Sequence, residues 1–405
     1  MPLPPQGRLA RGAGLGAVPG VRLGLWGSVE ALTGVAVVLP PPGTAAGVDV
    51  RGGGPASRET AILAPGTLEY GADAVVLTGG SAFGLAAAGG VQAGLAEQGI
   101  GCPAGAGLRV PIVPAAAIFD LGRADGAPHP PGEAEGRAAL DDALEPAGGR
   151  QPVRGSAGPG LGAWTGRGVS RGGLGQAAVT TPAGHTVAAL VVANPMGTVL
   201  GADGGLHAAS ALAGYGVELP RVDPRAVREL LTGAGAAPGA PAATAGGAAP
   251  PGAGRSSAPP ATAGPLNTTI ACLVTDAALT DAQATRLAAS AHAGIARAVW
   301  PSHTLFDGDT VFALALGSQP LPAGPAAGEA LALLNIAAAD ALSAAIVDAV
   351  LCADDGPEPG GSAGAGHRED RARREAEGAD SPAAPRPPAL ASVFPELARA
   401  WRAVD

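Results

Sequence analysis

Short hydrophobic runs bounded by Gly, Pro or Asp recur along the chain and have the lengths of β-strands. Each run is rich in β-branched residues or alternates in side-chain size, and the runs cover residues 34–39, 73–77, 186–192, 268–274 and 310–316. In the last run Phe312, Leu314 and Leu316 would share one face, and smaller side chains would share the other. Because small side chains allow a second layer to approach, this pattern predicts a sheet covered on both sides.

Three other segments repeat their hydrophobic residues with the period of an α-helix. The clearest begins at Thr280, whose hydroxyl can cap the helix while Gln283 reaches back in a capping box. The other two are expected over residues 82–98 and 329–350. Since helices and strands are intermixed along the chain, the predicted fold class is α/β, with layers of both.

Two segments differ from the rest in composition. Residues 233–264 are almost wholly Ala, Gly, Pro and Thr, and residues 353–388 add Asp, Glu and Arg to the same background. Neither contains enough large hydrophobic residues to form a core, so both are predicted to be disordered. The rest of the chain must build the fold, and a hydrophobic content of 47% over 405 residues allows a sizeable core.

The charge balance argues against a nucleic-acid partner. All 25 basic residues are Arg, the net charge is −9, and no basic stripe is present to follow a phosphate backbone. The first 24 residues contain no uninterrupted apolar segment of the kind found in signal peptides, and no other segment is expected to span a bilayer. The protein is therefore expected in the cytoplasm, without a membrane partner.

Neither the cysteines nor the histidines have the spacing of a disulfide framework or a metal site. Three cysteines lie far apart and are expected as reduced, buried thiols: Cys102, Cys272 and Cys352. Four histidines lie on different elements and are expected to be solvated or to make single hydrogen bonds: His185, His207, His292 and His303. We therefore expect no metal and no cofactor.

A glycine turn between a predicted strand and a predicted helix, in the sequence LTGGSAFGL of residues 77–85, is a place where backbone N–H groups can bind anions. It lacks the G-x-G-x-x-G spacing and the Lys of a P-loop, and Phe83 stands where a serine-hydrolase elbow requires Gly. A tight turn with Ser81 as the helix N-cap is therefore the favoured interpretation of the segment taken alone.

Three further segments have ordinary structural interpretations when each is taken alone. Residues 307–309 (DGD) fit a turn with two solvated carboxylates, and residues 194–195 (NP) fit a turn at a strand end. Residues 267–269 (NTT) fit the entrance of a strand, where Thr is favoured. None of the three indicates a function by itself.

Together, however, these segments resemble the L-aminopeptidase/D-esterase family, which includes the β-peptidyl aminopeptidases. The shared blocks extend from about residue 24 to 352, and the longest of them, around the glycine turn, is highly specific. They are residues 32–35 (LTGV), 47–53 (GVDVRGG), 58–60 (RET), 76–85 (VLTGGSAFGL), 109–114 (RVPIVP), 119–120 (FD), 172–175 (GGLG), 267–269 (NTT) and 306–314 (FDGDTVFAL).

Family members are made as one chain that cuts itself ahead of a Ser or Thr, and the resemblance places this cut between Asn267 and Thr268. It implies an α subunit of residues 1–267 and a β subunit of residues 268–405. Thr268 would first attack the carbonyl of Asn267 and later attack the substrate. The chemistry is reasonable because a new α-amino group titrates near pH 8 and can serve as the base for the adjacent hydroxyl.

The resemblance also implies roles for other residues. Asn194 matches the family's oxyanion donor at a strand end, although Pro195 and Met196 depart from the family pattern. Asp309 would orient the new amine, with Asp307 beside it where better known relatives have Ser. Gly80 and Ser81 are candidate substrate-binding residues. Another departure is residues 155–162 (GSAGPGLG), where relatives carry a different Gly-rich run.

The family fold is a four-layer αββα sandwich like that of the N-terminal-nucleophile hydrolases, with different connectivity. The resemblance implies homo-oligomers of αβ units, usually tetramers, acting on a small peptide, amide or ester. Two alternatives stay open. Ornithine acetyltransferases share the architecture and the Thr nucleophile, and a chain that stays whole would only bind a ligand at the glycine turn.

Overall fold

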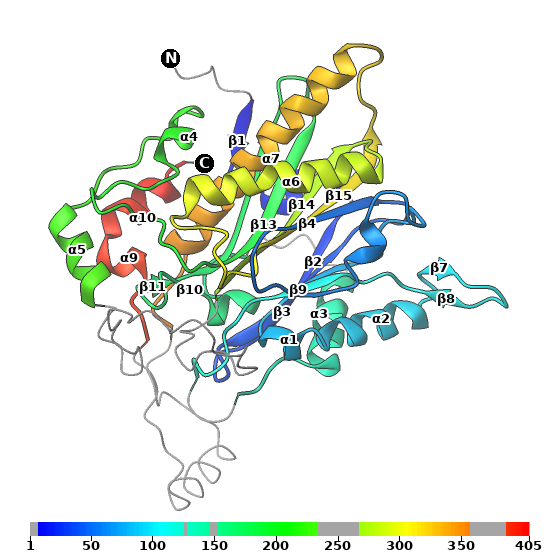
Figure 1. Ribbon diagram of the computed structural model, residues 1–405, viewed down its shortest axis with the longest axis horizontal. Coiled ribbons are helices and arrows are strands. Elements are labelled where there is room, and N and C mark those ends of the chain that lie inside the picture. The colour runs from blue at the N-terminus through cyan, green and yellow to red at the C-terminus, as the bar shows by residue number, and fades with distance from the viewer. Residues whose placement is uncertain (1–6, 125–127, 146–152, 234–266, 357–385, 405) are drawn as a thin grey trace, which may run out of the picture.

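The computed structural model describes residues 7–124, 128–145, 153–233, 267–356 and 386–404, which form four layers (Figure 1). Two sheets pack face to face, and helices cover the outer face of each. Most of both tracts predicted to be disordered, 233–264 and 353–388, lies outside the described residues. The four-layer α/β architecture predicted from the sequence is confirmed.

The larger sheet holds six strands and carries the functional segments. Its order is β1 (Arg8–Ala10), β12 (Gly173–Thr180), β13 (Thr186–Asn194), β14 (Thr268–Ala277), β15 (Thr310–Gln319) and β4 (Ala45–Val50). Neighbours are antiparallel except β14 and β15, which run parallel. The N-terminal strands β1 and β4 therefore form the two edges of the sheet, and the later strands β12 to β15 lie between them.

The second sheet holds five strands in the order β2 (Arg22–Ser28), β3 (Thr33–Leu39), β6 (Val75–Thr78), β9 (Ala115–Ala117) and β5 (Ala56–Arg58). Two short pairs lie apart from both sheets: β7 (Cys102–Pro103) with β8 (Arg109–Val110), and β10 (Trp164–Thr165) with β11 (Ser170–Arg171). A hydrophobic core that includes Val38, Leu77, Ile270 and Phe312 fills the space between the sheets.

Helices form the two outer layers. The long helices α6 (Asp281–Ala298) and α7 (Ala326–Leu351) cover the six-stranded sheet, whereas α2 (Ala87–Glu97) and α3 (Glu133–Leu144) cover the five-stranded sheet. The shorter helices are α1 (Ser81–Gly84), α4 (Ala209–Ala213), α5 (Pro224–Gly233), α9 (Leu390–Val393) and α10 (Pro395–Arg402), with 3-10 turns η1 (Gly14–Ala17), η2 (Ala61–Leu63) and η3 (Gly158–Gly162). The Gly-rich residues 155–162 therefore include a buried 3-10 turn.

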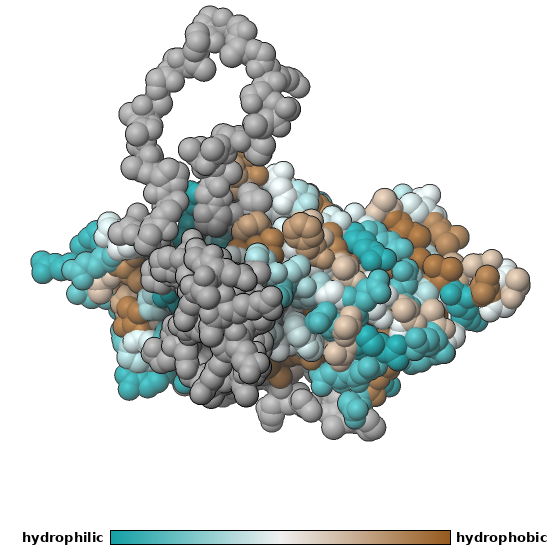
Figure 2. All heavy atoms as spheres, turned by 90° about the horizontal axis from the view of Figure 1, so that it is seen from below, coloured by the Kyte–Doolittle hydropathy of each residue, from teal (hydrophilic) through white to brown (hydrophobic). Residues whose placement is uncertain are grey.

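The face of the molecule on the side of α1, α2 and α3 carries hydrophobic residues broken up by hydrophilic ones (Figure 2). Phe83 in α1 and Leu108 next to β8 are large hydrophobic side chains that are exposed. Single exposed hydrophobic residues of this kind are normal on protein surfaces.

All five strands predicted from hydrophobic runs are present, and most of them are longer than the runs. The alternation in β15 is also confirmed: Phe312 and Leu314 enter the core between the sheets, and Val311 and Ala313 face the outer helices. Thr280 caps α6, with reciprocal hydrogen bonds between Thr280 and Gln283.

Two Gly- and Ala-rich strands, β12 and β4, were not predicted. Their glycines permit close approach of the outer helices: a Cβ on Gly175 would lie 2.0 Å from the carbonyl oxygen of Ala345 in α7, and one on Gly47 would lie 2.2 Å from the nitrogen of Thr285 in α6. Strand propensity is low for Gly and Ala, so packing rather than propensity decides these strands.

Two other predictions need correction. The helix expected over residues 82–98 is divided into α1 and α2, and α7 is long and apolar enough to cross a membrane by length and composition, contrary to the expectation from the sequence. However, 72% of its apolar window is buried inside the fold, as in the core helix of a globular protein.

Of the three cysteines, which are all unpaired, Cys272 is buried as expected but Cys102 and Cys352 are half-buried.

Candidate active site

The segments NTT (267–269) and DGD (307–309) lie side by side at the start of β14 and β15. Asn267 bridges to Asp307 in parallel register, and the pairing continues from Ile270 to Thr310. On the other side of β14, Asn194 at the end of β13 pairs with Thr268. The fold therefore brings together three segments that the sequence singled out separately.

Thr268 and the carbonyl group before it are in close contact. The Thr268 hydroxyl donates to the carbonyl oxygen of Asn267 at 2.5 Å, and the same oxygen accepts the backbone N–H of Gly308 at 3.1 Å. A Cβ on Gly308 would lie 2.9 Å from the Thr268 Oγ1 and 2.9 Å from the carbonyl oxygen of Gly54. Gly at 308 thus leaves room for the hydroxyl and presents a backbone donor to the peptide bond.

The side chain of Asn267 fixes the orientation of this peptide. Its Nδ2 donates to the carbonyl oxygens of Asn194 at 3.1 Å and Pro195 at 3.2 Å, and its backbone N–H donates to Phe306 at 3.2 Å. Asn267 is almost completely buried. The residue before the expected cut is therefore held between the end of β13 and the loop that precedes β15.

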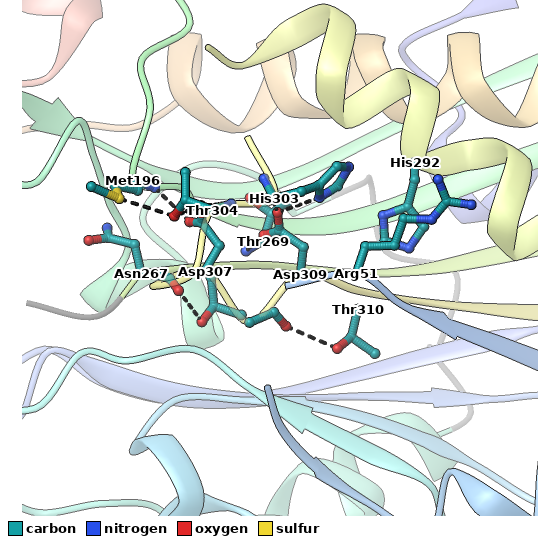
Figure 3. Close-up of polar contacts among 12 residues, drawn as sticks. Arg51, Met196, Asn267, Thr269, His292, His303, Thr304, Asp307, Asp309 and Thr310 are labelled. Atoms are coloured by element: carbon teal, nitrogen blue, oxygen red, sulfur yellow. Dashed lines mark hydrogen bonds and ion pairs between the residues drawn. The ribbon is translucent and has the colours of Figure 1, made fainter. Parts of the chain in front are cut away.

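Asp309 uses its two carboxylate oxygens for two different elements. One oxygen accepts the backbone N–H of Thr269 at 2.7 Å, and the other accepts the His303 ring Nδ1 at 2.7 Å and the His303 backbone N–H at 3.1 Å. The carboxylate is buried and lies beside Thr269, the residue that follows Thr268 in β14 (Figure 3). This position suits the expected role of orienting a new amine at Thr268.

Asp307 instead organises the loop around the site. Its carboxylate accepts the backbone N–H of Met196 at 3.0 Å and both the N–H and the hydroxyl of Thr304, at 2.9 and 2.6 Å (Figure 3). Burial raises the pKa of Asp307 above its usual range, and the charge of Asp309 raises it further. The alternative of a turn with two solvated carboxylates is wrong, because both side chains are buried.

Two histidines that were expected to be solvated or singly bonded lie together, and one of them, His303, contacts Asp309. The rings of His292 and His303 meet edge to face with their centroids 4.9 Å apart, and His292 is buried. They were missed because eleven positions separate them, on a helix and on a loop, and no metal-site spacing marks them. Within the described residues, no group of three or more His, Cys, Asp or Glu is placed to hold a metal ion.

Asn194 is buried at the end of β13, and its side-chain amide is held by three hydrogen bonds. Its Oδ1 accepts from the Arg123 guanidinium at 2.6 Å and from the backbone N–H of Trp164 at 3.0 Å, and its Nδ2 donates to the carbonyl oxygen of Phe119 at 3.3 Å. Two donors on Oδ1 fix which way the amide faces. In the structure this Nδ2 does not donate to the carbonyl oxygen of Asn267, which accepts the backbone N–H of Gly308 instead.

Arg123 was not predicted from the sequence. Its guanidinium is buried, lies 4.7 Å from the centre of the Trp164 ring and also donates to the carbonyl oxygen of Gly162. Burial lowers the pKa of Arg123 to about 10, which still leaves it charged near neutral pH. The block around Phe119 and Asp120 pointed to this region, but one sequence cannot show that Arg123 would reach Asn194.

The glycine turn is occupied by internal hydrogen bonds. Gly79 donates to Gly34, Gly80 donates to the Asp120 carboxylate at 2.7 Å, and Ser81 donates to Ile118, so these three N–H groups are not available to an anion. The interpretation of Ser81 as the helix N-cap is wrong. Gly80 is the N-cap of α1, with a left-handed φ of 79°, and no side chain caps this helix. Substrate binding by Gly80 and Ser81 stays a prediction.

Comparisons with known proteins identify relatives of this chain. Residues 15–362 match the model of Peptidase family S58. An uncharacterized aminopeptidase of Mycobacterium tuberculosis is 39% identical over 330 residues, which cover 78% of this chain and 85% of the relative. A 6-aminohexanoate-oligomer endohydrolase of Kocuria sp. is 30% identical over 348 residues, covering 82% and 83%.

Two solved structures share the fold. The beta-aminopeptidase of Burkholderia sp. superposes with a TM-score of 0.60 at 23% identity over 98% of this chain and 96% of its own. The L-aminopeptidase D-Ala-esterase/amidase of Ochrobactrum anthropi, described as a variant of the N-terminal-nucleophile hydrolase fold, gives 0.58 at 22% identity over 91% and 96%. With its family match and its relatives named as aminopeptidases, this chain belongs to Peptidase family S58, of the L-aminopeptidase/D-esterase type, and is an aminopeptidase or related amidohydrolase.

Proposed function

We propose that the chain cuts itself between Asn267 and Thr268, and that Thr268 then serves as the N-terminal nucleophile for hydrolysis of peptides, amides or esters. The observation that carries this proposal is the contact of the Thr268 hydroxyl with the carbonyl of Asn267, at 2.5 Å between the oxygens, while Gly308 donates to that carbonyl. A nucleophile beside a carbonyl and a fixed donor on its oxygen are the elements that acyl transfer requires.

Self-cleavage would proceed as an N-to-O acyl shift. Thr268 Oγ1 forms a bond to the carbonyl carbon of Asn267, and the negative charge that develops on the carbonyl oxygen is stabilised by the Gly308 N–H. The C–N bond then breaks, the hydroxyl proton ends on the released amine, and an ester joins Asn267 to Thr268. Water hydrolyses this ester and leaves a carboxylate on Asn267 and a free α-amine on Thr268.

In turnover the free α-amine of Thr268 would act as the general base for its own hydroxyl. The amine must be unprotonated to accept the proton, and its ordinary pKa of about 8 is near neutrality. The Asp309 carboxylate accepts the backbone N–H of Thr269, the residue after Thr268, and from this position it can orient the amine. Asn194 lies opposite Thr268 on β13 and would donate to the oxyanion of the substrate once Asn267 has moved away.

The relatives suggest two substrate classes: N-terminal residues of peptides, as for the aminopeptidases, or 6-aminohexanoate oligomers, as for the endohydrolases. Ala115, Ala116 and Ala117 form the fully buried strand β9 and are not exposed to a substrate. By contrast, Leu305 and Phe306 are 74% and 38% exposed on the loop next to Asn267. We therefore expect substrates with an apolar group next to the scissile bond.

The experiment is a substrate panel on the purified, self-cut enzyme, with Thr268→Ala as the inactive control. L-, D- and β-aminoacyl p-nitroanilides are compared with 6-aminohexanoate oligomers, and acetylornithine with glutamate tests the transferase alternative. Hydrolysis that depends on Thr268 supports the proposal. Equal hydrolysis by Thr268→Ala, or acetyl transfer without hydrolysis, contradicts it. Location in the cytoplasm and assembly into oligomers of αβ units stay predictions.

A further inference from the structure

His303 has an uncommon backbone conformation that brings two of its donors to one carboxylate oxygen. Its φ is +54°, in the left-handed region where a non-Gly residue costs roughly 1 kcal/mol or more. In this conformation the backbone N–H and the ring Nδ1 both reach the same oxygen of Asp309, at 3.1 and 2.7 Å. These charge-assisted hydrogen bonds offset the conformational cost and fix the ring against Asp309.

The other oxygen of Asp309 faces β14, where it accepts the N–H of Thr269 at 2.7 Å. Asp309 is therefore a bridge between His303 and the strand that begins at Thr268. The Asp309 side chain is 2% exposed, so its charge acts on nearby groups with little screening by water. Any change in the charge of His303 changes the net charge of this bridge, one residue away from Thr268.

The surroundings favour a proton on His303 rather than on His292. Burial lowers the pKa of His292 to about 4, so this ring is neutral near pH 7, and its Nε2 lies 3.1 Å from the backbone oxygen of Asp49. Burial alone would lower the pKa of His303 too, but the hydrogen bond and the charge of Asp309 raise it above the usual value. The His303 side chain is 20% exposed, so its proton can exchange with solvent.

The charged groups near His303 come from three elements. Asp307 and Asp309 lie on its own loop, His292 lies on α6, and Asp49 and Arg51 lie at the end of β4 (Figure 3 labels Arg51). Asp49 is already paired with Arg51 at 2.7 Å. Asp307 is occupied by Thr304 and Met196. Asp309 is thus the acidic group in direct contact with the His303 ring.

We propose that His303 is a positioning residue for the reaction, which holds Asp309 against β14 and, when protonated, offsets the negative charge that Asp309 presents to the α-amine of Thr268. This inference rests on the proposed role of Thr268. A carboxylate without its partner favours the ammonium form of a neighbouring amine, and the amine must lose that proton to act as base. With His303 in place, the amine becomes an active base at lower pH.

The test compares His303→Asn and His303→Gln with the unmodified enzyme. Asn tolerates a left-handed φ, and Gln keeps a longer side chain that can reach Asp309, so the two variants separate loss of the ring from loss of the backbone geometry. The matched control is His185→Asn. His185 precedes the start of β13, whereas Asn194 and Thr268 meet at its other end, roughly 30 Å away at the rise of a strand.

Two quantities are measured on self-cut protein: the pH profile of kcat/KM, and the pH dependence of reductive methylation of the Thr268 α-amine, followed by mass spectrometry. In both His303 variants we expect the acidic limb of the profile and the midpoint of methylation to move to higher pH together, by about one pH unit. His185→Asn should leave both unchanged.

Other outcomes have definite meanings. If the unmodified protein is never cut, the proposed function fails and no new amine exists. If it is cut and active but the His303 variants lose turnover equally at all pH values, or keep both midpoints, His303 acts on structure alone and the inference is wrong. Failure of both variants to fold would likewise assign the ring to the stability of the loop and contradict the inference.

Discussion

The backbone N–H of Gly308 donates to the carbonyl oxygen of Asn267 at 3.1 Å, so the peptide bond ahead of Thr268 is polarised by the loop that precedes β15. The side-chain Nδ2 of Asn194, the expected oxyanion donor, is directed to Phe119 at the same time. Two different donors are therefore available for two reactions. In the proposed mechanism Gly308 would serve the carbonyl of Asn267 during self-cleavage, and Asn194 would serve the substrates that follow.

The first prediction separates these two donors through Asn194→Asp. The Asp side chain keeps an acceptor for Arg123 and Trp164, which preserves the packing around the residue, but it has no N–H to donate. We expect self-cleavage to continue and turnover of the cut enzyme to fall by about two to three orders of magnitude. Mass spectrometry follows the cleavage and a p-nitroanilide assay follows turnover. A decrease of less than tenfold would remove Asn194 from the catalytic step.

The second prediction concerns the sign of the effect of Asp309. A carboxylate near an ammonium raises the pKa of the amine, so Asp309→Asn lowers that pKa and moves the acidic limb of kcat/KM to lower pH. Turnover should also fall, because the amine loses the group that orients it. The shift is opposite in direction to that expected for His303→Asn. Movement of both variants in the same direction would show that Asp309 and His303 do not act on a common amine.

The third prediction concerns stability. Asp348 is fully buried in α7, pairs with Arg154 at 2.8 Å and accepts Nε1–H of Trp401 in α10 at 2.9 Å. Removing one partner of a buried charge network leaves the others without compensation. We expect Asp348→Ala to lower the free energy of unfolding by about 3–5 kcal/mol. The free energy of unfolding is measured by urea titration with and without Asp348→Ala. Both proteins also carry Thr268→Ala, which is expected to keep the chain uncut.

The control for this prediction is Asp141→Ala. Asp141 pairs with Arg137 on the surface of α3 at 3.0 Å, and exposed pairs contribute little. Its urea midpoint should be nearly unchanged. If the two substitutions had equal effects, the cluster around Asp348 would not hold the C-terminal helix in place.

Much of the architecture could be predicted because β3, β13 and β15 are coded by hydrophobic runs and α6 by its capping box at Thr280. The strands β12 and β4 could not be predicted, since their glycines reflect contact with α7 and α6, which lie far away in the sequence. Strand propensity describes neighbours along the chain and contains no information on such tertiary approach.

The candidate site was also predicted only in part. The resemblance identified Thr268, Asn194, Asp307 and Asp309, and the fold places all four around one peptide bond. The partners that fix them were not predicted. Arg123 and His303 carry no motif of their own. The contact of Arg123 with Asn194 arises only when segments from the two sheets meet, and the contact of His303 with Asp309 depends on the conformation of the loop that holds both.

The central claim is tested most directly by the mass and N-terminal sequence of the purified protein after incubation near neutral pH. We predict two pieces of about 25 and 13 kDa, in proportion to their lengths within the 38.6 kDa chain, with the smaller starting Thr-Thr-Ile-Ala. Thr268→Ser should also be cut, because it keeps the hydroxyl, and Thr268→Ala should remain one inactive chain. An unmodified protein that stays whole, or a Thr268→Ala variant that is cut and active, would contradict the account.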